Sequence, residues 1–141
     1  MIFPKNLALD TINNWGKDTM TDFLGIEFTK IGIDFLEATM PVCSRTKQPL
    51  GLLHGGASVV LAETLGSVAA TLTLDKEKQF CVGLEINANH LKSVREGFVR
   101  GVASPIHLGK KTQVWEIRIY TESGDLSCIS RITMAILEKN Q

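Results

Sequence analysis

The sequence predicts an α+β domain in which an antiparallel β-sheet wraps around one long, buried helix. The first observation is a run over residues 54 to about 73 that is rich in Ala, Leu and Val and holds one charged residue. A helix that is apolar nearly all the way round lies inside a protein. The second observation is the alternation of apolar and polar residues over 80–137, which is typical of half-buried strands. Because strands and helices do not alternate along the chain, a parallel sheet is not expected.

The first part of the chain predicts a short helix and a hairpin. Residues 7–15 carry apolar side chains at helical spacing and are followed by Gly16, which commonly stops a helix. Over residues 25–42, two short alternating stretches are separated by a glycine and an aspartate, which is typical of a β-hairpin. Proline cannot donate to a strand ladder, so Pro41 is expected to end the second strand.

A polar loop is predicted over residues 44–51, and the long helix follows it. Beyond the helix, a turn at residues 123–125 and the glycine at position 109 separate the strands. The apolar side chains of these strands form three alternating sets: Leu84, Ile86 and Ala88; Trp115, Ile117 and Ile119; and Ile132, Met134 and Ile136.

Length and composition limit the classes of protein that fit this chain. Its 141 residues predict one domain over 1–141, and 15 basic against 15 acidic residues give no electrostatic footprint of a nucleic-acid binder. The first residues lack a secretion leader pattern and no later stretch of about 18 apolar residues occurs, so a cytoplasmic protein without a membrane partner is expected. Three widely spaced cysteines predict reduced thiols. We expect neither a metal nor a cofactor.

One carboxylate lies in the middle of the apolar run. Glu63 has small or apolar helical neighbours, and an unpaired buried carboxylate is costly. Charged groups that intrude in this way mark functional sites, so we interpret Glu63 as a catalytic residue. The alternative is a structural carboxylate that pairs with an arginine or reaches solvent. Ser67 lies one turn later, where its hydroxyl can bond the carboxylate or, alternatively, the carbonyl four residues before it.

Two glycines stand where the long helix begins. Gly55 and Gly56 leave backbone amides unblocked at the positive end of the helix dipole, where they can bind a carbonyl oxygen as an oxyanion hole. The alternative is that they only permit a tight turn into the helix. His54 can position the carbonyl or its water, or can merely pack or cap the helix. Gln48, in the preceding loop, is an available amide donor.

Helix geometry separates the two candidate groups. Gly55 and Glu63 are eight residues apart, which is about 12 Å along a helix axis, so one carbonyl cannot touch both. If both act on one substrate, they come from different subunits whose long helices lie antiparallel. A two-fold homodimer with two shared sites is therefore expected, and an open sheet edge favours the same pairing.

The segment over residues 48–67, QPLGLLHGGASVVLAETLGS, closely resembles the signature of hotdog-fold thioesterases of the PaaI-like and Arthrobacter-type 4-hydroxybenzoyl-CoA families. Further similar stretches are GLEINANH at 83–90, REG at 95–97, HLG at 107–109 and QVWE at 113–116. The similarity covers nearly the whole chain and is closest to the thioesterases of menaquinone synthesis and of enterobactin proofreading. Cys43 departs from it, because an acidic residue is expected there.

The resemblance implies a hotdog fold and hydrolysis of an acyl-CoA thioester, with aromatic acyl groups preferred. Glu63 is implied to be the nucleophile or general base, supported by Ser67. The Gly55 amide would polarise the thioester carbonyl, with Gln48 and His54 beside it. A homotetramer of two dimers is also implied. The residues implied to hold pantetheine and the CoA phosphates are Gly83, His90, Leu91, Lys92, Ser93, His107, Leu108, Gly109, Lys110, Lys111 and Thr112.

Several alternatives stay open at this point. Lys92, Arg95, Lys110 and Lys111 form either a local cationic patch suited to phosphates or a solvated charged rim. A hotdog hydratase or dehydratase would act on acyl thioesters without releasing a thiol. A non-enzymatic acyl-CoA-binding module would bind such molecules without turnover.

Overall fold

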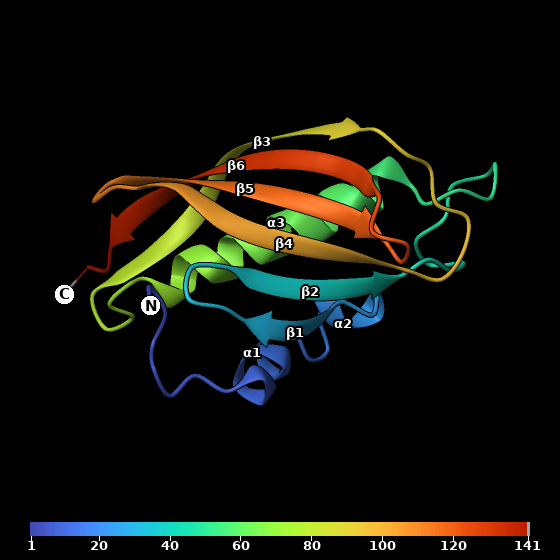
Figure 1. Ribbon diagram of the computed structural model, residues 1–141. Helices are drawn as coiled ribbons and strands as arrows, with labels where there is room; N and C mark the ends of the chain where they lie inside the picture. Colours follow the sequence, from blue (N-terminus) through green and yellow to red (C-terminus); the bar gives the residue numbers. More distant parts are fainter. Residues whose placement is uncertain (141) are drawn as a thin grey trace.

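The structure, a computed structural model, describes residues 1–140 and contains one antiparallel sheet that curves around a long helix (Figure 1). The strand order is β1-β2-β4-β5-β6-β3. This is the α+β arrangement that the sequence predicts. The elements are α1 (Leu9–Trp15), α2 (Met20–Phe23), β1 (Glu27–Ile31), β2 (Leu36–Pro41), α3 (Gly55–Leu72), β3 (Gln79–His90), β4 (Phe98–Leu108), β5 (Thr112–Thr121) and β6 (Leu126–Glu138).

The long helix α3 forms where the apolar run predicts it, with His54 as its N-cap and Thr73 as its C-cap. It lies very close to the sheet. A Cβ added to Gly66 would lie 2.5 Å from Cγ2 of Ile132, so no larger residue fits between helix and sheet without a shift. By length and composition α3 could also cross a membrane, but 50% of that stretch is buried inside the protein. The helix therefore occupies the position of a core helix.

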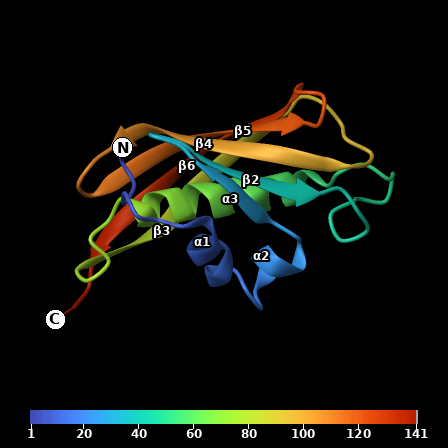
Figure 2. The same ribbon diagram turned by 60° about the horizontal axis from the view of Figure 1, so that its bottom comes forward.

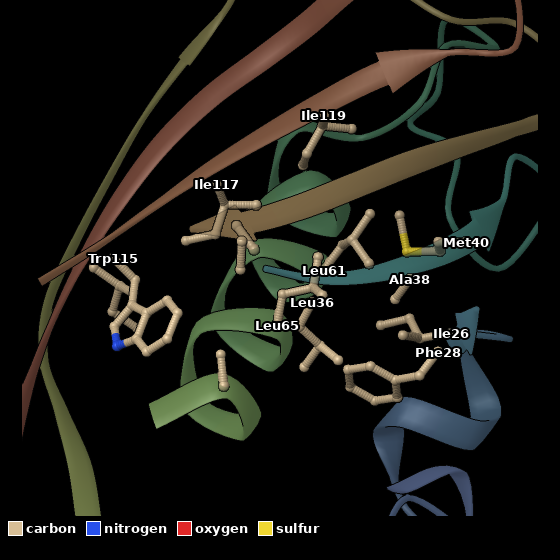
Figure 3. Packing of buried hydrophobic residues seen from close by; sticks show 14 of the residues in the cluster. Ile26, Phe28, Leu36, Ala38, Met40, Leu61, Leu65, Trp115, Ile117 and Ile119 are labelled. Atoms are coloured by element: carbon tan, nitrogen blue, oxygen red, sulfur yellow. The ribbon is translucent and has the colours of Figure 1, made fainter. Parts of the chain in front are cut away.

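Side chains from the sheet and from α3 meet in one hydrophobic core. Trp115, Ile117 and Ile119 of β5 are fully buried, as are Leu61 and Leu65 of α3 (Figure 3). The alternation in β5 and β6 is confirmed, because their predicted apolar sets face α3 and are buried. These contacts fix the position of α3, and with it the residues at the start of the helix.

The N-terminal region is largely as predicted, and one of its elements is new. The expected hairpin is confirmed as β1 paired with β2, and Pro41 is the last residue of β2. α1 ends at Trp15 with Gly16 as its C-cap. Figure 2 shows α1 and α2 on the same side of the sheet as α3. The sequence did not predict α2, because a four-residue helix without a buried residue has no apolar periodicity.

The two edges of the sheet differ in how they are covered. Asn13 of α1 covers β1: its Nδ2 donates to the Phe28 carbonyl at 3.1 Å and its Oδ1 accepts the Phe28 N–H at 2.8 Å. On the other edge, β3 pairs with β6 on one side and with no other strand of residues 1–140. Leu84 is 62% exposed on β3, so its prediction as half-buried is wrong. A bulge after Gly83 shifts the alternation there.

Candidate active site

The start of α3 leaves one backbone amide without a partner. Nδ1 of His54 accepts from the Gly56 N–H at 2.7 Å. The His54 carbonyl accepts from the amides of Ala57 at 2.9 Å and Ser58 at 3.2 Å. No hydrogen bond within residues 1–140 uses the Gly55 N–H. Of the four amides that open the helix, Gly55 alone is therefore free to bind a ligand oxygen.

Both glycines are needed for space, which favours close approach over the interpretation as a tight turn. Neither Gly55 nor Gly56 has a positive φ. A Cβ on Gly55 would lie 2.9 Å from Nε2 of His90, and a Cβ on Gly56 would lie 2.9 Å from Nδ1 of His54. Two imidazole rings, one from β3 and one from the cap, therefore lie against the first two residues of α3.

The loop before α3 is held by a buried threonine. Thr46 is 1% exposed and its hydroxyl donates to the Pro41 carbonyl at 2.8 Å. Its own carbonyl accepts the His54 N–H at 2.8 Å. In the same loop, Oε1 of Gln48 accepts the Leu50 N–H, which leaves the side-chain N–H groups of Gln48 free to donate. The loop thus holds a cap and an oriented amide donor near the same helix end.

A cavity of about 360 Å³ opens beside the free amide. Its lining includes one lysine and one histidine, and none of its lining residues is a carboxylate or a cysteine. Within residues 1–140, no cluster of three or more His, Cys, Asp or Glu residues could hold a metal ion. The cavity can therefore hold and polarise a carbonyl but lacks a carboxylate to attack it. Its lining residues are Gln48, Leu52, Leu53, Gly55, Ser58, His90, Leu91, Lys92, Ser93, Val94 and Ser127.

Glu63 lies on the half-exposed side of α3, outside this cavity. Within residues 1–140 its carboxylate forms neither an ion pair nor a hydrogen bond, so the structural pairing with an arginine is not observed. A Cβ on Gly83 would lie 2.7 Å from Oε1 of Glu63, which places the carboxylate against the edge strand β3. The Ser67 hydroxyl bonds neither the carboxylate nor the backbone carbonyl of Glu63. Its hydroxyl contacts Sδ of Met134 at 4.0 Å.

The residues expected to bind CoA fall into two groups at opposite ends of the sheet (Figure 1). Residues 90–93 lie at the end of β3, beside the cavity. The turn with Lys110 and Lys111 lies near the start of β3, because Thr112 pairs with Ala135 and Ala135 pairs with Val82. This turn lines a second cavity of about 710 Å³. The predicted patch of four cations is thus divided within one chain.

Lys92 has an anionic partner that the sequence did not reveal. Its ammonium lies 2.5 Å from Oδ2 of Asp125, and this bond, followed by one from Ser123, lowers the pKa of the Asp125 carboxyl. Ser127 fixes the same segment, because its hydroxyl donates to the Lys92 carbonyl at 2.8 Å and its carbonyl accepts the Leu91 N–H at 2.8 Å. These contacts join residues 33 to 36 positions apart, so no local pattern could have predicted them.

Known proteins resemble this chain over nearly its whole length. A family model for the thioesterase superfamily matches residues 50–128. The 1,4-dihydroxy-2-naphthoyl-CoA hydrolase of Escherichia coli (strain K12) is 59% identical over 137 residues, which cover 97% of this chain and 100% of that protein. The proofreading thioesterase EntH of Cronobacter turicensis is 51% identical over 137 residues, which cover 97% of this chain and 99% of that protein.

A solved structure shows the same fold. It is a mutant thioesterase from Pseudomonas aeruginosa, which aligns with a TM-score of 0.96 at 49% identity and covers 99% of this chain and 100% of that one. Sequence and structure agree in this respect, and the chain therefore belongs to the thioesterase superfamily, with the hotdog fold that its sequence resembles.

Proposed function

We propose that the protein hydrolyses an aromatic acyl-CoA thioester to the free acid and CoA, with Glu63 as the reacting carboxylate. The proposal is supported by one arrangement. The free amide at the start of α3, that of Gly55, lies in a cavity without a carboxylate. On the same helix, the half-buried carboxylate of Glu63 has no partner within residues 1–140. The relative that is 59% identical is a hydrolase of 1,4-dihydroxy-2-naphthoyl-CoA. That compound is therefore the first aromatic substrate to test.

The reaction develops negative charge on the thioester oxygen. The Gly55 N–H, at the positive end of α3, donates to that oxygen and stabilises the charge as it forms. Glu63 acts in one of two ways. As a nucleophile, its carboxylate attacks the carbonyl carbon, expels the CoA thiolate and leaves an anhydride that water then hydrolyses. As a general base, it removes a proton from the water that attacks. Both routes consume one water and give acid and thiol.

A second copy of the chain supplies the carboxylate that the cavity lacks. Gly83 lies against Glu63, and His90 lies against Gly55, seven residues along the open edge strand β3. When two β3 strands pair antiparallel with Gly83 opposite His90 of the partner subunit, the two-fold axis passes between residues 86 and 87. Each Glu63 then approaches Gly55 of the partner subunit, which the separation of about 12 Å along one helix forbids within a single chain.

The same pairing joins the two groups of CoA-binding residues. The start of one β3 lies beside the end of the other, so Lys110 and Lys111 come near the partner's residues 90–93. Cations from both subunits then surround the CoA phosphates. We extend the proposal to a tetramer of two such dimers, on the basis of the family resemblance. A cytoplasmic location completes the proposal, and the free thiols of Cys43, Cys81 and Cys128 suit a reducing compartment.

Release of free thiol from a panel of CoA thioesters tests the proposal. The panel contains 1,4-dihydroxy-2-naphthoyl-CoA, benzoyl-CoA and a series of fatty acyl-CoAs. We expect kcat/KM to be about tenfold or more higher for the aromatic substrates. Equal values across the panel would contradict the aromatic preference. Conversion of a substrate without thiol release would identify a hydratase or dehydratase, and tight binding without conversion would identify a sensing module.

A further inference from the structure

We infer that His54 is a positioning residue that caps α3 through Nδ1 and thereby keeps the Gly55 N–H as the one amide available to the substrate. The inference rests on the proposed function, because it assigns the thioester oxygen to the Gly55 amide. It concerns how that amide is selected from the four at the start of the helix.

The geometry of His54 is that of an N-cap. Its backbone is extended, with φ −66° and ψ 131°, and its Nδ1 accepts the Gly56 N–H at 2.7 Å. Ser, Thr, Asp and Asn usually perform this role with a side-chain oxygen, and here a ring nitrogen replaces the oxygen. Because Nδ1 accepts a hydrogen bond, the neutral ring carries its proton on Nε2. A doubly protonated ring has no acceptor and could not form the cap.

The cap determines which amide meets the substrate. Without the bond to Nδ1, the N–H groups of Gly55 and Gly56 would both lack acceptors, and an incoming oxygen could bind either one. Successive residues are rotated by about 100° around a helix axis, so an oxygen bound at Gly56 would point in a different direction from the carboxylate of the partner subunit. Capping Gly56 removes this unproductive binding mode.

His54 is fixed by hydrogen bonds and does not line the cavity. Its N–H donates to the carbonyl of the buried Thr46 at 2.8 Å, and the Thr46 hydroxyl donates to the Pro41 carbonyl at the end of β2. The His54 ring lies so close to Gly56 that an added Cβ would be 2.9 Å from both Nδ1 and Cε1. The cavity is lined by His90 and not by His54. The cap therefore acts on the substrate through the Gly55 amide.

A matched pair of variants separates capping from chemistry. His54→Asn keeps an N-cap side chain, whereas His54→Gln carries the same amide on a longer side chain that is not a preferred cap. We expect His54→Asn to retain kcat within about threefold of the wild type and His54→Gln to lose about tenfold or more, with KM little changed in both. If the imidazole itself takes part in the chemistry, both variants will lose kcat equally, and that result would overturn the inference.

Exchange of the Gly56 amide proton gives a second readout. We expect slow exchange in the wild type and in His54→Asn and fast exchange in His54→Gln, because only the last lacks an acceptor. Equal exchange in all three would show that Nδ1 does not cap the helix. Should His54→Gln fail to fold, the Asn variant decides alone: retained kcat supports the cap, and lost kcat excludes it.

Two controls keep the outcomes distinct. Asn13→Ala removes hydrogen bonds between residues that do not line the cavity. We expect it to lower stability without lowering kcat, which would show that lost stability does not imitate a lost cap. A wild-type protein that releases no thiol from any CoA thioester would refute the proposed function. An active wild type whose His54→Asn variant is inactive would refute only the role of His54.

Discussion

The carboxylate of Glu63 has no neutralising partner within residues 1–140 and lies against the edge strand β3. Glutamine has nearly the same size but is neither a nucleophile nor a base. We therefore expect Glu63→Gln to lower kcat by about 10²- to 10⁴-fold while KM changes little, measured as thiol release under saturating substrate. Full turnover by this variant would remove Glu63 from the mechanism, whichever of its two roles is correct.

The Gly55 amide can be deleted by a single substitution. Proline lacks an N–H and is favoured at the first position of a helix. The residue before it must be extended, and His54 already has ψ 131°. Gly55→Ala is the matched control, because it also adds a Cβ next to His90 but keeps the N–H. We expect Gly55→Pro to have a kcat about 10²- to 10³-fold below that of Gly55→Ala. Equal kcat values would show that this N–H does not bind the carbonyl.

The ion pair between Lys92 and Asp125 competes with the binding of a phosphate by Lys92 at the cavity. The side chains are 54% and 50% exposed, so the pair contributes little to stability. Lys92 lowers the pKa of Asp125, so the pair is complete at neutral pH and is lost only as the pH falls through that lowered pKa.

Removing the anion should release Lys92 for the CoA phosphates. We expect Asp125→Asn to lower KM for a CoA thioester by about two- to fivefold at low salt and by less at high salt, with kcat unchanged. Initial rates at two ionic strengths measure this effect. An unaltered KM at low salt would mean that Lys92 does not contact CoA.

At the scale of elements, α1 protects one sheet edge with a single side chain. Asn13 bonds both the N–H and the carbonyl of Phe28, so an alanine would leave two backbone groups of β1 without partners. We expect Asn13→Ala to lower the free energy of unfolding by about 1–3 kcal/mol, measured by urea denaturation. An unchanged free energy of unfolding would show that water replaces both bonds without cost.

Elements with a strong hydrophobic period could be predicted from the sequence, and those set by distant contacts could not. The apolar run and the residues at its ends define α3 closely, and alternation defines β5 and β6. Leu84 was misplaced because a bulge interrupts the alternation of β3, and a bulge depends on the pairing with β6. α2 is too short to have a period of its own.

At the scale of the whole molecule, some residues of the candidate site could be identified from the sequence and others could not. Glu63 and Gly55 stand out because each differs from its local surroundings, and their separation along one helix requires two subunits if both act on one thioester. The contact of Lys92 with Asp125 and the anchoring of His54 by Thr46 are not visible, because they depend on how loops meet after folding. The openness of β3 likewise follows only from the strand order.

Mixing two inactive variants tests whether the sites are shared between subunits. A heterodimer of Glu63→Gln and Gly55→Pro chains has one site in which both defects meet and one site with neither. After unfolding and refolding together, half of the dimers are mixed, so we expect about a quarter of wild-type activity to return. The separately refolded variants are the control. Sites contained within single chains would each keep one defect, and activity would then stay at the level of the variants.

The bond pattern around Asn13 also limits the size of the assembly that strand pairing can build. Within residues 1–140, β3 is the edge strand that stays open to such pairing, since Phe28 of the opposite edge strand β1 is already bonded to Asn13. When two copies pair, both open β3 strands become internal. The combined sheet then ends in a β1 strand on each side, and each β1 is bonded to Asn13. Under the proposed pairing of two β3 strands, growth by strand addition would stop at two copies and would not continue into the open-ended fibres that unprotected sheets produce.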